Sequence, residues 1–107
     1  MYDLIIVGGG PAGLTAGIYA QRARLKTLLL EREFVGGQIA VSDVIENYPG
    51  FPSISGAALM EKFEAHAKGF GLEIKLAGVV NISESAGVKV LKTTEGDLKA
   101  RAVIIAT

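Results

Sequence analysis

Three glycines, at positions 8, 10 and 13, have the spacing of a nucleotide-binding loop. In a nucleotide-binding loop each has a mechanical reason to lack a side chain. Gly8 permits a tight turn, Gly10 lets a pyrophosphate approach the main chain, and Gly13 lets a helix press against a sheet. Glycines are also common in plain structural turns, so the residues on either side decide between the two interpretations.

Both flanks of the loop have the pattern that nucleotide binding requires. Leu4–Val7 is a short apolar run, typical of a strand buried on both faces of a parallel sheet. Pro11 suits the first turn of a helix, which the sequence predicts to run from Pro11 to about Arg24. Lys26–Leu30 predicts a second buried strand closed by Glu31. The result is a strand-helix-strand unit, the context of the dinucleotide fingerprint.

Glu31 supplies a second polar group next to this loop. It lies 18 residues after Gly13, where a carboxylate can accept hydrogen bonds from a ribose 2′-OH and repels a 2′-phosphate. The phosphates would lie over unpaired N–H groups at the start of the first helix, where the helix dipole favours negative charge. The residues therefore predict FAD or NAD rather than NADP. Arg32 is either an adenosine contact or a solvated surface charge.

The composition limits other classes of function. The 107 residues include 11 basic and 11 acidic side chains, so no broad charge favours nucleic acid or an anionic membrane as a partner. The lack of cysteine excludes a dithiol redox centre within the chain. Leu4–Val7 is too short to span a bilayer and does not resemble a signal peptide. We expect a soluble cytoplasmic protein of one domain. No catalytic or metal-binding residue is predicted, and His66 is expected to be an ordinary helix residue.

The remaining sequence predicts a mixed α/β domain. Arg32–Pro52 reads as a long loop with a helical turn around Ile39–Val44, and loops of that length are usually functional. Gly56–Lys68 predicts a second helix and Leu72–Leu76 a third strand. Three runs separated by turn residues predict an antiparallel three-stranded meander: Val79–Ser83, Val88–Thr94 and Asp97–Ala102. The last run, Ala102–Ala106, predicts a further buried strand.

Three segments resemble the amino-terminal part of the low-molecular-weight thioredoxin reductases of bacteria and archaea. They are VGGGPAGLTAGIYAQRARLKTLLLE, GGQIAVSDVIENYPGFP and AVIIAT, and the resemblance covers essentially all of the chain. It implies a Rossmann-like FAD-binding domain over residues 1–107, with a parallel sheet flanked by helices and a small antiparallel meander. It also implies that the C-terminal segment completing the fold is missing, and that NADPH binds to a second domain absent from this chain.

The resemblance assigns cofactor contacts by position. One group matches the pyrophosphate loop and the ribose acceptor: Gly8, Gly10, Pro11, Ala12, Gly13 and Glu31. Arg32 is added as an adenosine contact. Another group matches the segments that pass along the flavin or the adenine: Gly37, Gln38, Asn47, Val79, Ala106 and Thr107. Among these, Val79 corresponds to the adenine contact, and Ala106 and Thr107 to the start of an Ala-Thr-Gly motif near the isoalloxazine.

The resemblance also implies a function. The family passes electrons from NADPH through FAD to a CxxC disulfide and then to thioredoxin. This chain has no cysteine and no second glycine fingerprint, so we expect a truncated flavin half that binds FAD or ADP but is not an active enzyme alone. Thioredoxin would be a partner of the full-length protein only. An apolar edge at Val103–Ala106 predicts a homo-oligomer.

Three alternatives stay open. The chain could be a minimal or engineered nucleotide-binding module without catalysis. It could be part of a ferredoxin-NADP reductase of the same fold, which lacks the redox cysteines. A stand-alone NAD-dependent enzyme is the third alternative, although it leaves the GGQ and ENYPGFP segments unexplained.

Overall fold

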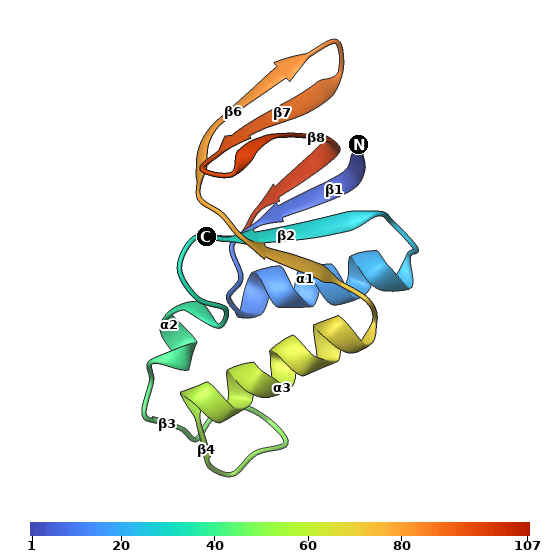
Figure 1. Ribbon diagram of the computed structural model, residues 1–107. Helices are drawn as coiled ribbons and strands as arrows, with labels where there is room; N and C mark the ends of the chain where they lie inside the picture. The colour runs from blue at the N-terminus through green and yellow to red at the C-terminus, as the bar shows by residue number, and fades with distance from the viewer.

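The computed structural model describes all residues from Met1 to Thr107 as a mixed sheet with helices packed on it (Figure 1). The elements in chain order are β1 (Tyr2–Val7), α1 (Pro11–Arg22), β2 (Thr27–Glu31), α2 (Gly37–Ala40), β3 (Val44–Ile45), β4 (Ile54–Ser55), α3 (Gly56–Gly69), β5 (Glu73–Leu76), β6 (Val79–Ser85), β7 (Val88–Thr93) and β8 (Gly96–Ile105). The main sheet has six strands in the order β5-β2-β1-β8-β7-β6. Strands β5, β2, β1 and β8 are parallel, whereas β7 and β6 extend the sheet in antiparallel fashion.

The two central strands, β1 and β2, are short apolar strands whose residues are mostly buried, as continuous apolar runs require. Strands β1 and β2 share two hydrophobic clusters with the elements around them. One cluster joins them to α1 and α3: Leu4, Ile6, Leu14, Ala20, Leu29, Ala67 and Leu72. The other joins them to the meander of β6, β7 and β8: Ile5, Leu28, Leu30, Ala77, Leu91 and Ala100. Figure 1 shows α1 and α3 together on one side of the sheet, with the β6–β7 hairpin projecting away from them.

Helix α1 lies close to its neighbours because its buried face is made of small residues. Gly13, Gly17 and Ala20 are buried there with Leu14. A Cβ on Gly17 would lie 2.5 Å from a methyl carbon of Leu72, so only glycine fits without a rearrangement. The predicted start at Pro11 is confirmed. The helix ends at Arg22, earlier than predicted, since Arg24 has a left-handed φ of 60° that no helix can continue through.

Helix α3 begins as the sequence predicts. The Ser55 hydroxyl oxygen accepts a hydrogen bond of 3.1 Å from the N–H of Ala58, which satisfies one of the free amides of the first turn. The observed range, Gly56–Gly69, differs from the predicted helix by one residue. This helix packs beside α1 and supplies Leu59, Met60 and Ala67 to the buried interior.

The meander is confirmed, but its third strand does not end where the sequence predicts. The two strands expected on either side of Ala102 are one continuous strand, β8. Its first half pairs antiparallel with β7, and its second half pairs parallel with β1. The prediction that the last run is buried is wrong at Ile104 and Ile105, which are 40% and 68% exposed. Over this half, β8 has a paired neighbour on one side only, and the homo-oligomer predicted from its apolar residues stays a prediction.

The loop between β2 and α3 also contains structure that the sequence prediction misplaces. The helical turn is α2, four residues from Gly37, and not Ile39–Val44. The glycines at positions 36 and 37 have φ values of 110° and 59°, so the chain reverses there and the turn follows directly. The two-residue strands β3 and β4 pair antiparallel and close the loop, which no sequence pattern of that length predicts.

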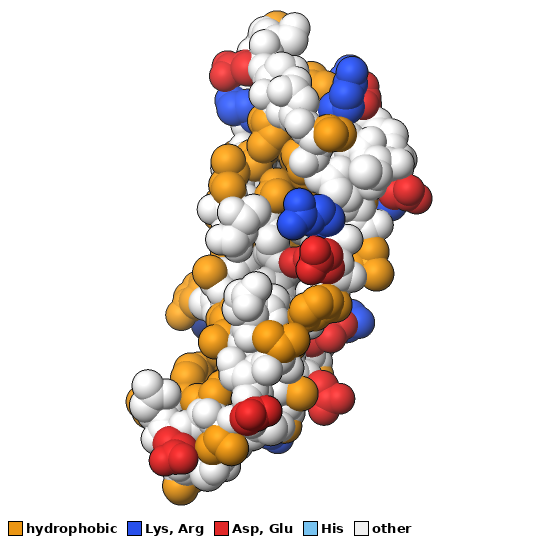
Figure 2. All heavy atoms as spheres, turned by 90° about the vertical axis from the view of Figure 1, so that its left-hand side faces the viewer, with side chains coloured by type: hydrophobic (Ala, Val, Ile, Leu, Met, Phe, Trp, Pro, Cys, Tyr) orange, Lys and Arg blue, Asp and Glu red, His pale blue; other side chains and the backbone are white.

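The surface carries both signs of charge. On the face shown in Figure 2, basic and acidic side chains alternate with exposed hydrophobic ones, and neither sign dominates. This distribution agrees with the equal numbers of basic and acidic residues in the sequence. None of the helices has the length and apolar character needed to cross a membrane.

Replacing Leu29 by alanine should lower the free energy of unfolding by about 2–5 kcal/mol, because the substitution leaves a cavity in the core. Leu29 is fully buried in β2. Leu76→Ala is the matched control, since Leu76 also lies in a parallel strand but is 58% exposed; its change should stay within about 0.5 kcal/mol. Denaturant unfolding followed by circular dichroism measures both, and equal losses would contradict the core assignment.

Candidate functional site

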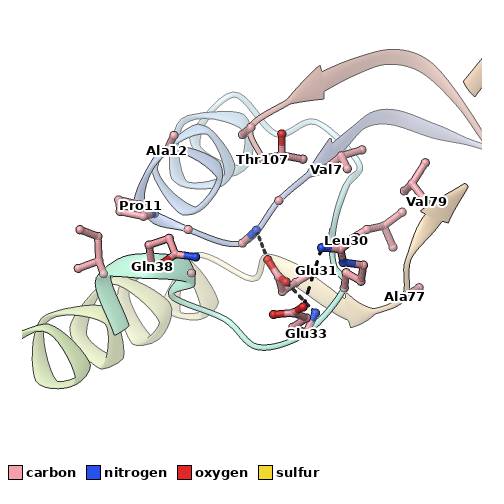
Figure 3. Close-up of a pocket in the computed structure, with 17 residues that line it drawn as sticks. Val7, Pro11, Ala12, Leu30, Glu31, Glu33, Gln38, Ala77, Val79 and Thr107 are labelled. Carbon is pink, nitrogen blue, oxygen red and sulfur yellow. Dashed lines mark hydrogen bonds and ion pairs between the residues drawn. The ribbon is translucent and has the colours of Figure 1, made fainter. Parts of the chain in front are cut away.

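A cavity of about 680 Å³ opens where β1, β2 and β8 end (Figure 3). Main-chain hydrogen bonds hold the three ends together: the N–H of Gly8 donates to the carbonyl of Leu30 at 2.8 Å, and the N–H of Ala106 donates to that of Val7 at 2.7 Å. In open α/β sheets, ligands bind in the crevice outside the carboxyl ends of the strands. The volume lies within the roughly 300–1,000 Å³ typical of small-molecule sites.

The start of α1 presents unpaired N–H groups to this cavity. Gly10 is the N-cap residue, no side chain caps the helix, and its first turn contains no acidic residue. The N–H groups of the lining residues Gly10 and Ala12 donate to no acceptor within the protein. Free amides at a helix N-terminus, together with the helix dipole, favour a bound anion such as a phosphate.

The glycines of the loop are required for two different reasons. Gly8 has a φ of 115°, and a Cβ on it would overlap the carbonyl group of Ala106. A Cβ on Gly13 would overlap the carbonyl oxygen of Gly8, so both positions need glycine for folding. Gly10 has an ordinary φ of −82°, and the nearest atom to a Cβ there is the carbonyl oxygen of Gly36, 4.0 Å away. The fold therefore tolerates a side chain at position 10, which is one of the residues that line the cavity.

Glu31, the last residue of β2, lies beside this loop. Its Oε1 accepts a hydrogen bond of 2.8 Å from the N–H of Gly9, and its Oε2 accepts one of 2.8 Å from the N–H of Glu33. Both bonds are drawn in Figure 3. Each carboxylate oxygen has capacity for a further donor, so the group can also accept hydrogen bonds from the hydroxyls of a ribose.

The segment between β5 and β6 forms the opposite wall. Gly78 and Thr94 exchange two hydrogen bonds of 2.9 Å, one from the Gly78 N–H to the Thr94 hydroxyl and one from the Thr94 N–H to the Gly78 carbonyl. These bonds fix the neighbouring residues Ala77 and Val79, which line the cavity. The stem of Arg32 packs over Gly78, while its guanidinium is largely exposed and 3.8 Å from the Glu33 carboxylate.

The cavity brings together most residues that the sequence singles out: Gly8, Gly10, Pro11, Ala12, Glu31, Arg32, Gly37, Gln38, Val79, Ala106 and Thr107. Two predicted contacts do not line it. Gly13 is buried beneath the loop against Gly8, and Asn47 lies in the 46–52 loop, where it lines a separate open hollow. Cofactor contact by any of these residues stays a prediction.

Six lining residues escape the sequence analysis: Val7, Gly9, Leu30, Glu33, Ile39 and Ala77. Strand ends at Val7 and Leu30 are part of the predicted strand pattern, so their place at the carboxyl edge was available from sequence. Gly9 carries a weaker signal as the middle of three successive glycines. A Cβ there would lie 3.1 Å from the Cβ of Glu31, a contact that only the structure reveals.

The polar groups of the lining can form hydrogen bonds with a ligand: backbone amides, the carboxylates of Glu31 and Glu33, the Arg32 guanidinium and the Gln38 amide. Hydrophobic residues make up seven of the 17 lining residues. No group of three or more His, Cys, Asp or Glu side chains is arranged to hold a metal ion. His66 is exposed on α3, remote from the cavity lining.

The chain belongs to the pyridine nucleotide-disulphide oxidoreductase family, whose sequence model matches residues 2–107. It is 48% identical over 106 residues to a thioredoxin reductase of Bacillus subtilis (strain 168), an alignment that covers 99% of this chain and 34% of that protein.

Solved structures agree with this family. The crystal structure of Lactococcus lactis thioredoxin reductase (FR conformation) superposes with a TM-score of 0.96 at 40% identity, covering 100% of this chain and 35% of that one. Thioredoxin reductase from Streptococcus pyogenes MGAS5005 gives a TM-score of 0.96 at 39% identity, with the same coverage. The chain thus spans only 34–35% of the length of these relatives. The predicted fold class and the resemblance to thioredoxin reductases are confirmed.

Gly13→Ala should destabilise the protein by about 1–3 kcal/mol, because the new methyl group overlaps the Gly8 carbonyl and forces α1 away from β1. Gly69→Ala is the control: it lies in the last turn of α3 with no atom within 4 Å of the added Cβ. That change should be neutral or stabilising by up to about 1 kcal/mol. Thermal and denaturant unfolding compare the two, and wild-type stability in Gly13→Ala would refute the close helix contact.

Proposed function

We propose that this chain is the FAD-binding half of a thioredoxin-reductase-like pyridine nucleotide-disulphide oxidoreductase, with residues 1–107 as the flavin domain. The observation that carries the proposal is that one cavity contains both the free amides at the start of α1 and the carboxylate of Glu31. The amides suit a pyrophosphate, and the carboxylate suits the hydroxyls of the adjoining ribose. The resemblance to thioredoxin reductases supports FAD as the dinucleotide.

The residues present fit both ends of such a cofactor. Figure 3 shows Val79 on one side of Glu31 and Gln38 on the other. The Val79 side suits the adenosine half, and the side of Gly37 and Gln38, opposite Thr107, suits the flavin half. When bound, the isoalloxazine would supply reversible electron transfer. This chain's residues would bind the cofactor, orient it, and exclude a 2′-phosphate through the negative charge of Glu31.

We infer the remaining activity from the family. In the full-length protein, electrons would pass from NADPH through FAD to a CxxC disulfide and on to thioredoxin. The 107 residues contain no cysteine, so the disulfide would lie in other residues. The resemblance implies that the NADPH site would lie in other residues as well. This chain alone would bind FAD or ADP without completing the reaction. The exposed Ile104 and Ile105 beside the open side of β8 are where the proposed oligomer contact would form.

Protein incubated with excess FAD and then freed of unbound flavin should retain visible flavin absorbance and quench flavin fluorescence. ADP should compete with FAD for the cavity. ADP carrying a 2′-phosphate should bind about tenfold more weakly or worse, because its charge would lie against the Glu31 carboxylate. Equilibrium titration calorimetry gives the dissociation constants.

Three outcomes of these titrations discriminate between the functions. A protein that takes up no FAD at high micromolar concentration would contradict the proposal. Equal affinities for ADP and FAD would mean that the flavin end contributes no binding energy, in favour of a nucleotide-binding module without catalysis. Tighter binding of NAD than of FAD would support the stand-alone NAD enzyme.

Gly10→Ala should raise the dissociation constant for FAD by about tenfold or more while leaving the fold intact. The added methyl group meets no protein atom closer than 4.0 Å. In the proposed complex it would obstruct the approach of the pyrophosphate to the main chain, and overpacking a tight contact costs roughly 1–3 kcal/mol. The unfolding free energy should change by less than about 0.5 kcal/mol. Gly69→Ala serves again as the control, with unchanged FAD affinity. Wild-type affinity in Gly10→Ala would place the phosphates elsewhere.

A further inference from the structure

We propose that Glu31 is a positioning residue for the glycine-rich loop in addition to an acceptor for ribose hydroxyls. Its carboxylate joins the loop after β1 to the segment after β2, and so holds the free amides in their binding arrangement before a nucleotide arrives. The inference rests on the proposed function, because it concerns how that site is kept ready.

Both oxygens of this carboxylate accept hydrogen bonds from the main chain. Oε1 accepts from the Gly9 N–H and Oε2 from the Glu33 N–H, each at 2.8 Å. Hydrogen bonds of this length to an ionised acceptor are about twice as strong as those between neutral groups. The carboxylate thus connects two main-chain segments, the loop after β1 and the chain after β2.

The bonds around Gly9 set the direction of a free amide. Its N–H is held by Glu31, and its carbonyl oxygen accepts a hydrogen bond of 2.7 Å from the N–H of Gly36. The carbonyl of Gly9 and the N–H of Gly10 belong to one planar peptide unit. The Glu31 bond therefore holds the peptide plane before Gly9, and the Gly36 bond holds the plane after it, which contains the N–H of the lining residue Gly10.

The sequence of the loop makes such a restraint necessary. Gly8, Gly9 and Gly10 follow one another, and glycine loses more conformational freedom on ordering than any other residue. Position 9 is not part of the fingerprint spacing, yet it too is glycine. The structure explains this residue by the carboxylate: a Cβ on Gly9 would lie 3.1–3.3 Å from the Cβ, Cγ and Oε1 atoms of Glu31.

The restraint moves the ordering cost of the loop from binding to folding. Glutamine at position 31 keeps the size of the side chain but offers a single acceptor oxygen, and its NH₂ group meets one of the two N–H donors. If the binding-competent fraction falls to about a tenth, every ligand that uses the amides binds about tenfold more weakly, with or without ribose hydroxyls. A carboxylate that acts only on the hydroxyls affects only ligands that carry them.

The test measures ADP and 2′,3′-dideoxy-ADP against wild type, Glu31→Gln and the control Glu61→Gln, an exposed residue of α3. In Glu31→Gln, the dissociation constant for dideoxy-ADP should rise about tenfold relative to wild type. The dissociation constant for ADP should rise by a larger factor, because ADP also loses the acceptor for its hydroxyls. The control should match wild type for both ligands. A Glu31→Gln protein that loses ADP affinity but keeps dideoxy-ADP within about twofold would overturn the positioning role, since RT ln 2 is below the net worth of one hydrogen bond.

Amide hydrogen exchange on the ligand-free protein tests the same inference without any nucleotide. The amides of Gly9 and Glu33 should be protected in wild type and exchange at least about tenfold faster in Glu31→Gln, with Ile6 unchanged in the core. Exchange at Gly9 of wild type that is as fast as in an unstructured peptide would overturn the inference, whether or not the variants fold. Failure of wild type to bind ADP or FAD would instead sink the proposed function, and the exchange data would still decide the loop restraint. If Glu31→Gln does not fold, Glu31→Asp replaces it in the test. Aspartate draws both acceptor oxygens back by one methylene, so the protection of the Gly9 and Glu33 amides should lie between that of wild type and that of an unstructured peptide.

Discussion

The site depends on the absence of side chains where α1 meets β1. Gly13 lies against the carbonyl of Gly8, and Gly8 in turn lies against the carbonyl of Ala106. These contacts bring the first turn of α1, the end of β1 and the end of β8 to one point. A single methyl group at either glycine would separate them. The free amides face the cavity only because the helix starts there.

The cavity is formed partly by the end of a core strand, β2, and partly by loops. Leu28, Leu29 and Leu30 are fully buried, and Glu31 follows them directly at the rim of the cavity. Because Glu31 is the last residue of a strand that is fixed in the core, the position of its carboxylate is well defined. The loops that complete the cavity are held by apolar contacts, as at Ala77, and by hydrogen bonds between backbone and side chain. Gly78 with Thr94 provides one such restraint, and Glu31 provides another.

Local patterns in the sequence predict much of this arrangement. The apolar run of β1, the glycine spacing and the acidic end of β2 are read within one strand-helix-strand unit, and the structure brings them together in one cavity. Asn47 is different, because its place depends on how the 46–52 loop folds back through β3 and β4. The hydrogen bonds of Glu31 were also beyond prediction, since they join residues 22 positions apart in one direction and 2 in the other.

The extent of β8 shows why a change of pattern can mislead. Around Lys99 and Arg101 polar and apolar residues alternate, and a continuous apolar run follows. From the sequence, this change predicts a boundary between two strands. In the structure it marks a change of partner, from the half-exposed antiparallel pairing with β7 to the parallel pairing with β1. The alternation of polar and apolar residues indicates what a strand packs against more directly than it indicates where the strand ends.

Because β8 is continuous, the tight turn before it controls the alignment of a distant wall. Gly96 has a φ of 109°, and the Thr93 hydroxyl bonds across the turn to its carbonyl at 2.6 Å. A shift of one residue at that turn would rotate every side chain of β8 to the opposite face. Ala106 and Thr107 would then leave the cavity. The geometry of the turn before β8 therefore determines which residues of the strand lie at the cavity.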